Sequence, residues 1–240
     1  MTLKKLSIVI PCYNEEKNIH PLFEKIKKLL EDYSFVEIII IDNGSTDNTN
    51  ENIMSSDLFN EKKINLLKLE KNIGYGHGIM SGVNIAQSQF ISWCHADLQT
   101  EPSDVLNAYT KNIEKLKSEK YIIKGLRKNR NFFDSMFTFG MSLFASIVFK
   151  KKINDINAQP KLFPKSFLKY MKDYPKDFSL DLYLLVMAKA NNYGIINHEV
   201  IMKKRLFDEA KGGGSLKGKI KLIKRTVIYI IELKKKLWNL

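Results

Sequence analysis

The first 125 residues alternate between short apolar runs and longer segments with helical spacing. Apolar runs at residues 6–10, 36–41, 64–69, 90–93 and 121–124 predict five strands. The segments between them, at residues 18–30, 46–55, 77–87 and 103–117, predict helices, the last with Ser103 as its N-cap. Strands that alternate with helices are typical of a mostly parallel sheet covered on both faces, so we expect a doubly wound α/β fold.

The second half of the chain has a different pattern. Residues 150–160 have loop composition, and helical patterns dominate after them. The triplet at residues 212–214 is all glycine, which predicts a hinge, and a basic amphipathic pattern follows it up to Trp238. We therefore expect one main domain over residues 1–210 and a helical C-terminal extension over residues 211–240. The extension lies at a membrane interface, or it packs on the domain or on a partner subunit.

Residues 132–149 form the most apolar stretch, with Asp134 as its single charged residue. Their length is at the margin of what a membrane-spanning helix needs. Small polar residues recur at spacings of three and four, however, at Ser135, Thr138, Ser142 and Ser146. Because this spacing places them on one helical face, we expect a buried or interface-lying helix rather than a spanning one.

Composition and charge narrow the class of protein. The chain has 240 residues, 44% of them hydrophobic and 27% charged, which excludes disorder and coiled coil. Its net charge of +13 is concentrated, since residues 211–240 hold nine Lys and Arg residues and one acidic residue. Positive charge beside apolar helices favours an anionic membrane surface over a nucleic acid, the alternative being solvated helix faces. Cys12 and Cys94 lie in apolar segments and predict reduced, buried thiols in a cytoplasmic protein.

Polar clusters follow four of the predicted strands. They lie at residues 11–15, 42–47, 72–74 and 95–99. Ligands of open α/β sheets bind at the carboxyl ends of the strands, so we expect these four loops to form one site.

Two of these loops carry candidate chemistry. Asp42 ends a strand just before a glycine turn, where a carboxylate accepts hydrogen bonds from a base or a ribose; the alternative is a plain Asx turn. His95 and Asp97, with Gln99 as a third group, share one side of an extended segment and are candidate ligands of a divalent metal. The alternatives are a structural histidine and a capping aspartate.

Together these segments resemble the family 2 glycosyltransferases of GT-A fold, including the dolichyl-phosphate mannose synthase branch. The likeness runs in order over residues 6–125 and continues more weakly to about residue 215. Four motifs in order are a specific signal, whereas one alone is not. The matching stretches are Ile8-Val-Ile-Pro11-Cys-Tyr-Asn14-Glu15-Glu16, Ile41-Asp42-Asn43-Gly44-Ser45-Thr46-Asp47, Asn72-Ile-Gly74 with Gly82, and His95-Ala-Asp97-Leu-Gln99-Thr-Glu-Pro102.

The resemblance implies a nucleotide-diphosphate-sugar donor and a Mg²⁺ or Mn²⁺ ion. Asp42 would contact the nucleoside and Asp97 the metal on the diphosphate. Two positions depart from the family pattern, since Asn43 and His95 stand where the family usually has Asp. An imidazole makes Mn²⁺ more plausible beside Mg²⁺, or it leaves the metal to Asp97 and Gln99. The implied donor-binding residues are Pro11, Asn14, Glu15, Asp42, Asn72, Gly74 and Asp97.

The resemblance also implies an acceptor side. Arg127 and Arg130 would clamp an acceptor phosphate, a task suited to the guanidinium fork, and Gln159 would line the sugar pocket. Asp181 would be the general base for a hydroxyl acceptor, whereas a phosphate acceptor needs no base and Asp181 would then orient the substrate. Arg205, with the glycines at residues 213–214 and Ser215, would close over the donor diphosphate. Asp97, Asp181 and Arg205 are thus the catalytic candidates.

These expectations define one main function and two alternatives. The main one is inverting transfer of a sugar from a nucleotide-diphosphate donor to a lipid-linked polyprenyl phosphate. It would take place at the cytoplasmic face of the membrane, to which the enzyme binds peripherally through its basic helices. The first alternative uses a saccharide hydroxyl as acceptor in surface polysaccharide assembly. The second is a non-catalytic module that binds membrane or nucleic acid. We expect no nucleic-acid partner and leave a homo-oligomer open.

Overall fold

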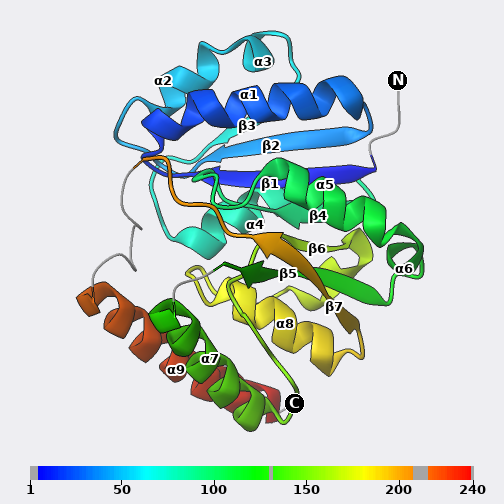
Figure 1. Cartoon of the computed structure of the whole chain (residues 1–240), viewed down its shortest axis with the longest axis vertical. Helices are drawn as coiled ribbons and strands as arrows, with labels where there is room; N and C mark the ends of the chain where they lie inside the picture. The colour runs from blue at the N-terminus through cyan, green and yellow to red at the C-terminus, as the bar shows by residue number, and fades with distance from the viewer. Residues whose placement is uncertain (1–4, 130–131, 208–215, 239–240) are drawn as a thin grey trace.

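The computed structural model describes residues 5–129, 132–207 and 216–238. Its core is a seven-stranded sheet with strand order β3-β2-β1-β4-β6-β5-β7 (Figure 1). The first four strands in this order run parallel, β6 is antiparallel to both of its neighbours, and β7 is parallel to β5. The strands are β1 Leu6–Cys12, β2 Val36–Asp42, β3 Asn65–Lys68, β4 Phe90–Trp93, β5 Tyr121–Lys128, β6 Lys161–Pro164 and β7 Gly194–Ile201.

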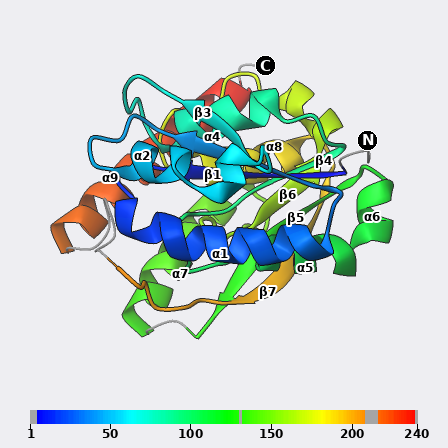
Figure 2. The same cartoon turned by 90° about the horizontal axis from the view of Figure 1, so that it is seen from above.

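Helices cover both faces of the sheet because its central strands are apolar on both sides. Along β1, Ile8 and Ile10 face one buried core and Val9 faces the other. The first core is closed by α1 Glu16–Asp32, α2 Thr49–Met54, α3 Asp57–Asn60, α5 Pro102–Lys111 and α6 Ile113–Lys117. The second is closed by α4 Tyr75–Ile85, α7 Phe132–Phe149, the 3₁₀ helix Lys165–Tyr170, α8 Leu180–Ala190 and α9 Leu216–Trp238. Figure 2 shows α1 and α5 on one side of the sheet and α4 and α8 on the other.

The expected mostly parallel α/β fold is therefore confirmed, with three local differences. Helix α5 begins at Pro102, and its cap is Glu101 rather than Ser103, since Glu101 and Asp104 form a reciprocal capping box. The helix predicted over residues 103–117 is interrupted at Asn112. The second half is also less helical than expected, because β6 and β7 complete the sheet.

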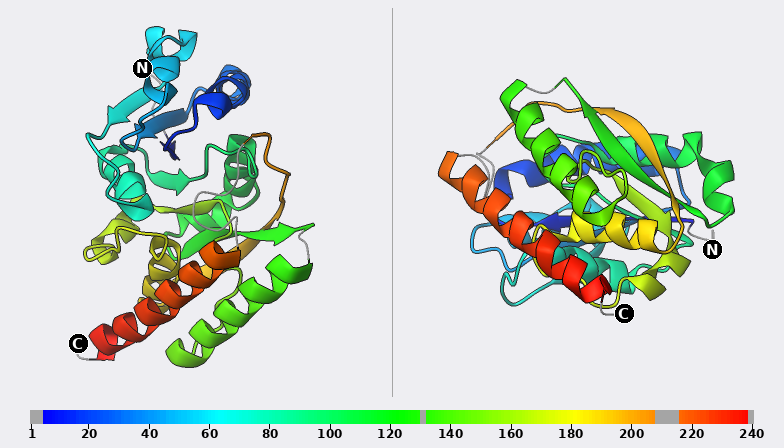
Figure 3. Two further views of the ribbon diagram at one scale, coloured as in Figure 1. Left: turned by 90° about the vertical axis from the view of Figure 1, so that its left-hand side faces the viewer. Right: turned by 90° about the horizontal axis from the view of Figure 1, so that it is seen from below.

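Helices α7 and α9 lie side by side, as Figures 1 and 3 show. In α7 the later part of the small polar stripe faces the protein: Ser142 is buried, and Ser146 donates to the carbonyl of Ile153 at 2.9 Å. Large apolar side chains on the opposite face are exposed, namely Met136, Phe139, Leu143 and Ile147. Among the described residues, none of the helices combines the length and the apolar character that crossing a membrane requires.

Helix α9 packs one face on the second core. Its Ile230 and Leu233 are buried there, and Lys236 forms an ion pair with Asp173 at 2.9 Å. The other face exposes Ile228, Ile231 and basic side chains. The predicted glycine hinge at residues 212–214 lies outside the described residues, as does Arg130, and the domain boundary at residue 210 stays a prediction.

Candidate functional site

A cavity of about 290 Å³ lies at the carboxyl ends of β1, β2 and β4. The loops that follow these strands supply most of its wall, together with the start of α4, as expected from the four polar clusters. Two further residues come from distant parts of the chain, Phe178 just before α8 and Arg205 after β7. The lining residues are Pro11, Cys12, Tyr13, Glu15, Asn43, Asn72, Gly74, Tyr75, His95, Ala96, Asp97, Phe178 and Arg205.

Hydrogen bonds lock the loops after β1 and β2 together behind this wall. Asn14 has a left-handed backbone, with φ of 52°, and its side-chain oxygen accepts from the Thr46 amide at 2.8 Å. The Ser45 amide donates to Asp42 Oδ1 at 2.9 Å. Asn14 and Asp42 thus lie behind the cavity rather than in its lining. Asp42 is fully buried, and its Oδ2 has no hydrogen-bond partner in the described part of the chain.

Glycines at the start of α4 allow a close approach of the segment before α8. A Cβ on Gly74 would lie 2.3 Å from the Lys176 carbonyl oxygen, and one on Gly76 would lie 2.3 Å from that of Pro175. Gly74 also has a backbone φ of 146°, a conformation that residues with a side chain rarely adopt. The Asn43 side-chain amide donates to the Gly74 carbonyl at 3.3 Å. Asn43, a departure from the family pattern, therefore fastens this wall through a donor that an aspartate lacks.

Arg205 holds two of the three predicted metal ligands. Its Nη2 lies 2.7 Å from Asp97 Oδ2, and its Nε donates to Gln99 Oε1 at 3.0 Å. Gln99 donates in turn to the Lys203 carbonyl at 3.4 Å and does not line the cavity. The carboxylate of Asp97 does line it, so Asp97 and His95 are the predicted ligands that the structure brings to the cavity.

An aromatic wall closes the cavity beside His95. The Tyr75 hydroxyl lies 2.9 Å from His95 Nε2, and the Tyr75 ring stacks on Phe178 with centroids 4.7 Å apart. Tyr75 also donates to Asp181 Oδ2 at 3.3 Å. Burial and the charge of Asp181 raise the pKa of Tyr75 well above its usual range, so this hydroxyl keeps its proton.

Asp181 lies in the first turn of α8, behind Tyr75, and is only 2% exposed. Its Oδ1 accepts from Trp93 Nε1 at 3.2 Å and from Gln159 Nε2 at 3.0 Å. Lys161 Nζ lies 3.3 Å from the same oxygen. Gln159 also donates to the Tyr75 hydroxyl at 3.2 Å. Asp181 and Gln159 are therefore brought close to the cavity wall, but neither lines the cavity.

Two lysines are buried next to this carboxylate. Lys161 and Lys124 pair across β6 and β5, and both are at most 1% exposed. Burial lowers the pKa of Lys161, although Asp181 opposes this effect. Burial, together with the charge of Lys161, lowers the pKa of Lys124 to about 7. Lys124 donates to the Gly125 carbonyl at 2.9 Å rather than to a carboxylate.

Arg127, the predicted acceptor clamp, is held by Asp155. Its Nε donates to Asp155 Oδ1 at 2.9 Å, its Nη2 contacts the same oxygen, and its backbone amide donates to Asp155 Oδ2 at 2.8 Å. Burial by itself would raise the pKa of Asp155, but the hydrogen bonds and charge of Arg127 outweigh it, so that pKa lies below its usual range. Arg127 does not line the cavity.

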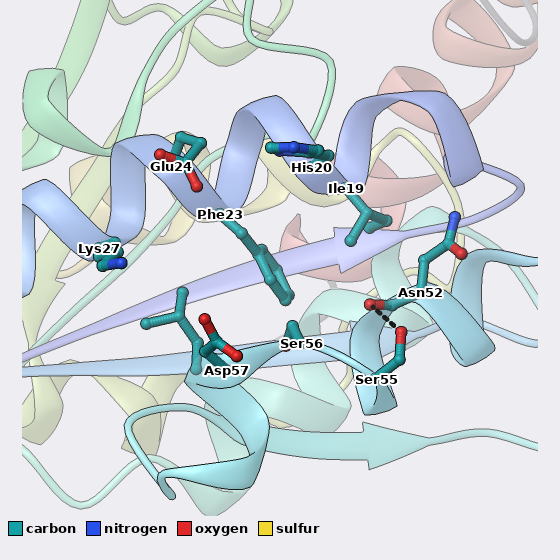
Figure 4. Close-up of a pocket in the computed structure, with 10 residues that line it drawn as sticks. Ile19, His20, Phe23, Glu24, Lys27, Asn52, Ser55, Ser56 and Asp57 are labelled. Carbon is teal, nitrogen blue, oxygen red and sulfur yellow. Dashed lines mark hydrogen bonds between the residues drawn. The ribbon is translucent and has the colours of Figure 1, made fainter.

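A wider cavity, of about 480 Å³, lies between α1 and the α2–α3 segment (Figure 4). In Figure 4, Ile19 and Phe23 point into it, whereas His20 and Glu24 lie along α1. None of the four strand-end clusters contributes to its lining. We therefore place the functional site at the strand ends, where the polar groups converge.

Sequence reasoning missed Tyr75 and Phe178 in the wall and the lysines behind it. Tyr75 directly follows the Asn72-Ile-Gly74 motif, which was a local signal for it. Phe178 precedes Asp181 by three residues, but its place in the wall depends on the approach of this segment to α4, which the sequence does not show. Lys124 and Lys161 had no local signal, because their burial depends on the pairing of β5 with β6.

Comparison with known sequences identifies the family. Residues 7–152 match the sequence family described as Glycosyl transferase family 2. The chain belongs to glycosyl transferase family 2. The family assignment made from the strand-end motifs is thereby confirmed, because the matched segment contains all four of them.

Two members with assigned names illustrate the relatives. A dodecaprenyl-phosphate galacturonate synthase of Rhizobium johnstonii is 26% identical over 174 residues, which are 70% of this chain and 50% of that protein. An undecaprenyl-phosphate 4-deoxy-4-formamido-L-arabinose transferase of Photorhabdus laumondii is 33% identical over 140 residues, 56% of this chain and 40% of that protein. The chain thus matches half or less of the length of these relatives.

Solved structures agree with the GT-A type of fold. Glucosyl-3-phosphoglycerate synthase from Mycobacterium tuberculosis, in complex with Mn²⁺, UDP and glucosyl-3-phosphoglycerate, superimposes with a TM-score of 0.71 at 15% identity, covering 96% of this chain and 80% of that chain. A mannosyltransferase from Pyrobaculum calidifontis, in complex with GDP-Man and Mn²⁺, gives 0.63 at 16% identity, covering 89% and 59%. At these identities the likeness concerns the fold.

Proposed function

We propose that this family 2 protein is an inverting glycosyltransferase. It moves a sugar from a nucleotide-diphosphate donor to a polyprenyl phosphate. The observation that carries the proposal is the strand-end cavity, in which Asp97, His95 and Arg205 meet Pro11 and Glu15. Two of the related proteins are named for transfer to polyprenyl phosphates, which supports the same class of acceptor here.

The donor side fits a nucleoside diphosphate. The unpartnered Oδ2 of Asp42 is a buried acceptor that a nucleoside N–H or hydroxyl would satisfy once the loop in front of it yields. The Arg205 guanidinium carries positive charge on the cavity wall, where it would stabilise the diphosphate as it leaves. Since no enzyme nucleophile is expected opposite the donor, the acceptor displaces the diphosphate directly and inverts the anomeric carbon.

The residues present also fit a Mg²⁺ or Mn²⁺ ion that is shared with the substrate. Within the described residues, no three His, Cys, Asp or Glu side chains are placed to hold a metal ion on their own. Ions at phosphate sites are commonly held by one or two carboxylates plus the phosphates themselves. Asp97 would supply the carboxylate and His95 a nitrogen, and the ion would offset charge on the departing diphosphate.

The placement of Asp181 supports a phosphate acceptor over a saccharide hydroxyl. A hydroxyl needs a base within hydrogen-bond reach, but Asp181 lies behind Tyr75 and is occupied by Trp93, Gln159 and Lys161. A phosphate monoester is already an anion and needs no base. Asp181 then serves to hold the Tyr75 wall in place.

The surface of α7 and α9 supports the proposal that the protein binds the cytoplasmic face of a membrane. The exposed apolar side chains of α7 lie beside a helix that exposes Lys224 and Lys235. Apolar side chains flanked by basic ones are suited to an anionic lipid surface. The protein would thus bind the membrane peripherally and meet its lipid acceptor there.

Calorimetric titration of the full chain with a panel of nucleoside diphosphates, with and without Mn²⁺, tests the donor site. We expect metal-dependent binding of one nucleotide, weakened at least tenfold in Asp97→Asn, because the carboxylate that shares the ion is lost. Asp57→Asn, in the cavity between α1 and α3, is the matched control and should bind as the unmodified protein does.

Two results would contradict the proposal. One is a folded protein that binds no nucleotide in the presence of metal. The other is nucleotide binding that depends on Asp57 and not on Asp97, which would move the site to the cavity of Figure 4.

A further inference from the structure

An anionic acceptor requires a cation at the cavity, and the described residues restrict which one it is. Arg127 is engaged by Asp155 through its side chain and its backbone amide. Lys124 and Lys161 are buried and bonded to carbonyl groups, and Lys161 also faces Asp181. Arg205 lies on the donor side, against Asp97. A further cation among the described residues lies against a residue that lines the cavity, and it comes from α9.

This cation is Arg225, which lies over the aromatic wall. Its guanidinium carbon is 5.5 Å from the centre of the Phe178 ring, and Phe178 both lines the cavity and stacks on Tyr75. Arg225 Nε also forms an ion pair with Asp177 Oδ2 at 3.1 Å. These two contacts hold the guanidinium next to Phe178, a lining residue of the cavity, while the Arg225 side chain remains 42% exposed.

The position of Arg225 is set by parts of the molecule that are themselves well packed. The segment that carries Asp177 and Phe178 is pressed against the glycines at the start of α4, where no Cβ would fit. Helix α9 is anchored through Ile230 and Leu233 in the second core. An anion that reaches Arg225 would therefore meet a guanidinium already held in position. This lowers the entropic cost of ordering the Arg225 side chain on binding.

We infer that Arg225 binds the phosphate of the acceptor, as the anion-recognising residue next to Phe178. The inference rests on the proposed transfer to a polyprenyl phosphate and deepens it. A guanidinium has five N–H donors in a planar fork, so the ion pair through Nε leaves the fork able to bond phosphate oxygens. The neighbouring helix α7 exposes apolar side chains, along which the lipid chain can lie while its phosphate reaches Arg225.

Binding of farnesyl phosphate, measured by calorimetry on the full chain with nucleotide present, tests this assignment. Farnesol and inorganic phosphate are measured in parallel to separate the contributions of chain and charge. We expect the unmodified protein to bind farnesyl phosphate more tightly than farnesol. In Arg225→Gln the ratio of these two affinities should fall at least tenfold. Arg225→Lys, which keeps the charge but not the fork, should restore part of it.

Lys236→Gln is the matched control, because it breaks a different ion pair between α9 and the domain, made with Asp173, which does not line the cavity. We expect it to leave farnesyl phosphate affinity unchanged, although both variants can lower the melting temperature. Nucleotide affinity should stay within twofold of the unmodified protein in all variants.

Four outcomes would overturn the inference, of which three concern the acceptor alone. These three are an unmodified protein that does not discriminate farnesyl phosphate from farnesol, an Arg225→Gln variant that keeps the preference, and inorganic phosphate that binds as tightly as farnesyl phosphate. Equal loss of nucleotide affinity in Arg225→Gln would make the residue a support of the donor wall, which also overturns it. Failure of the unmodified protein to bind any nucleotide contradicts the proposed function instead.

Discussion

Tyr75 connects the cavity to charged groups buried behind it. Its hydroxyl contacts His95 on the cavity side and Asp181 on the core side, and Lys161 lies on the far oxygen of that carboxylate. A buried carboxylate is stable when donors satisfy it, and Asp181 has donors on both oxygens. With the proposed phosphate acceptor, the aspartate that family resemblance offers as a base would serve as an anchor for the Tyr75 wall.

The buried Lys124 predicts a dependence of stability on pH. Its pKa is about 7 in the folded protein because of burial and the charge of Lys161, and about 10.4 in an unfolded chain. Between these values the unfolded chain binds more protons, so the unfolding free energy rises with pH. Relative to Lys124→Met, the unmodified protein should gain up to about 1.4 kcal/mol per pH unit between pH 7 and 9.

Urea unfolding at pH 7, 8 and 9 measures this gain. Lys128→Met is the matched control, since Lys128 lies on the same strand but is half exposed and paired with Glu199. Its unfolding free energy should run parallel to that of the unmodified protein. If Lys124→Met also runs parallel, Lys124 keeps an ordinary pKa and the buried charge is compensated in another way.

At the scale of single residues, the sequence predicts functional residues that lie close to a strand end. It misses contacts that depend on how distant strands pair. His95 and Asp97 follow β4 directly, and the structure places both at the cavity. Asp181 is a catalytic candidate from the sequence. Its ion pair with Lys161, however, follows from the antiparallel pairing of β6 with β4, which no local pattern reveals. Arg127 is likewise a candidate from the sequence, for binding the acceptor phosphate. Its ion-pair partner Asp155 comes from the loop before β6, and the sequence did not predict that contact.

At the scale of elements, the segment after β7 lies along the loop after β4. The Lys203 backbone amide donates to the Gln99 carbonyl at 3.0 Å, and Lys203 Nζ forms an ion pair with Glu101 Oε1 at 2.6 Å. Arg205, two residues on, reaches Asp97. Strand β7, which leads into this segment, and strand β6 were not predicted. For β6 the reason is that it is only four residues long and contains a Lys and a Pro.

This arrangement predicts competition between Arg205 and a metal ion for Asp97. Without a donor, the guanidinium occupies the carboxylate that the proposed ion would use. Replacing Arg205 with Gln should raise Mn²⁺ affinity about tenfold in the absence of nucleotide, because one charge-assisted hydrogen bond no longer competes. In the presence of nucleotide, the same variant should bind the diphosphate more weakly, since a cation is lost.

Mn²⁺ titration followed by electron paramagnetic resonance measures both affinities. Lys204→Gln removes an exposed neighbouring charge and serves as the matched control. Unchanged or lower Mn²⁺ affinity in Arg205→Gln without nucleotide would show that Arg205 and the metal do not share Asp97.

At the scale of the whole molecule, the exposed apolar side chains of α7 lie next to the basic side chains of α9, since the two helices run side by side (Figure 3). The polar stripe that argued against a spanning α7 turns inward, which leaves Phe139 and Ile147 more than 60% exposed. Sequence periodicity identified the two faces of α7, but it could not tell which face the protein covers. That choice depends on the packing of α7 against α9 and the second core.

We expect this surface to bind anionic vesicles, and replacing Phe139 and Ile147 with Gln to reduce vesicle binding at least tenfold. Burying either side chain in the lipid interface is worth about 1.5–3 kcal/mol, so losing both exceeds the roughly 1.4 kcal/mol that a tenfold change requires. Flotation with phosphatidylglycerol vesicles measures the bound fraction, and phosphatidylcholine vesicles show how much of it depends on charge. Met54→Gln with Ile85→Gln is the matched control, because these side chains are 49% and 45% exposed but lie on α2 and α4.

The same variants distinguish a membrane from a second copy of the chain as the partner of α7. If α7 pairs with α7 of another copy, the Phe139 and Ile147 variant converts a dimer to a monomer in analytical ultracentrifugation, and the unmodified protein does not float with vesicles. A monomer that floats only when the vesicles are anionic, and only when Phe139 and Ile147 are present, identifies α7 as a lipid-facing helix. Arg225, on the helix that packs against α7, contacts the cavity residue Phe178, so a lipid held on α7 could present its phosphate to it.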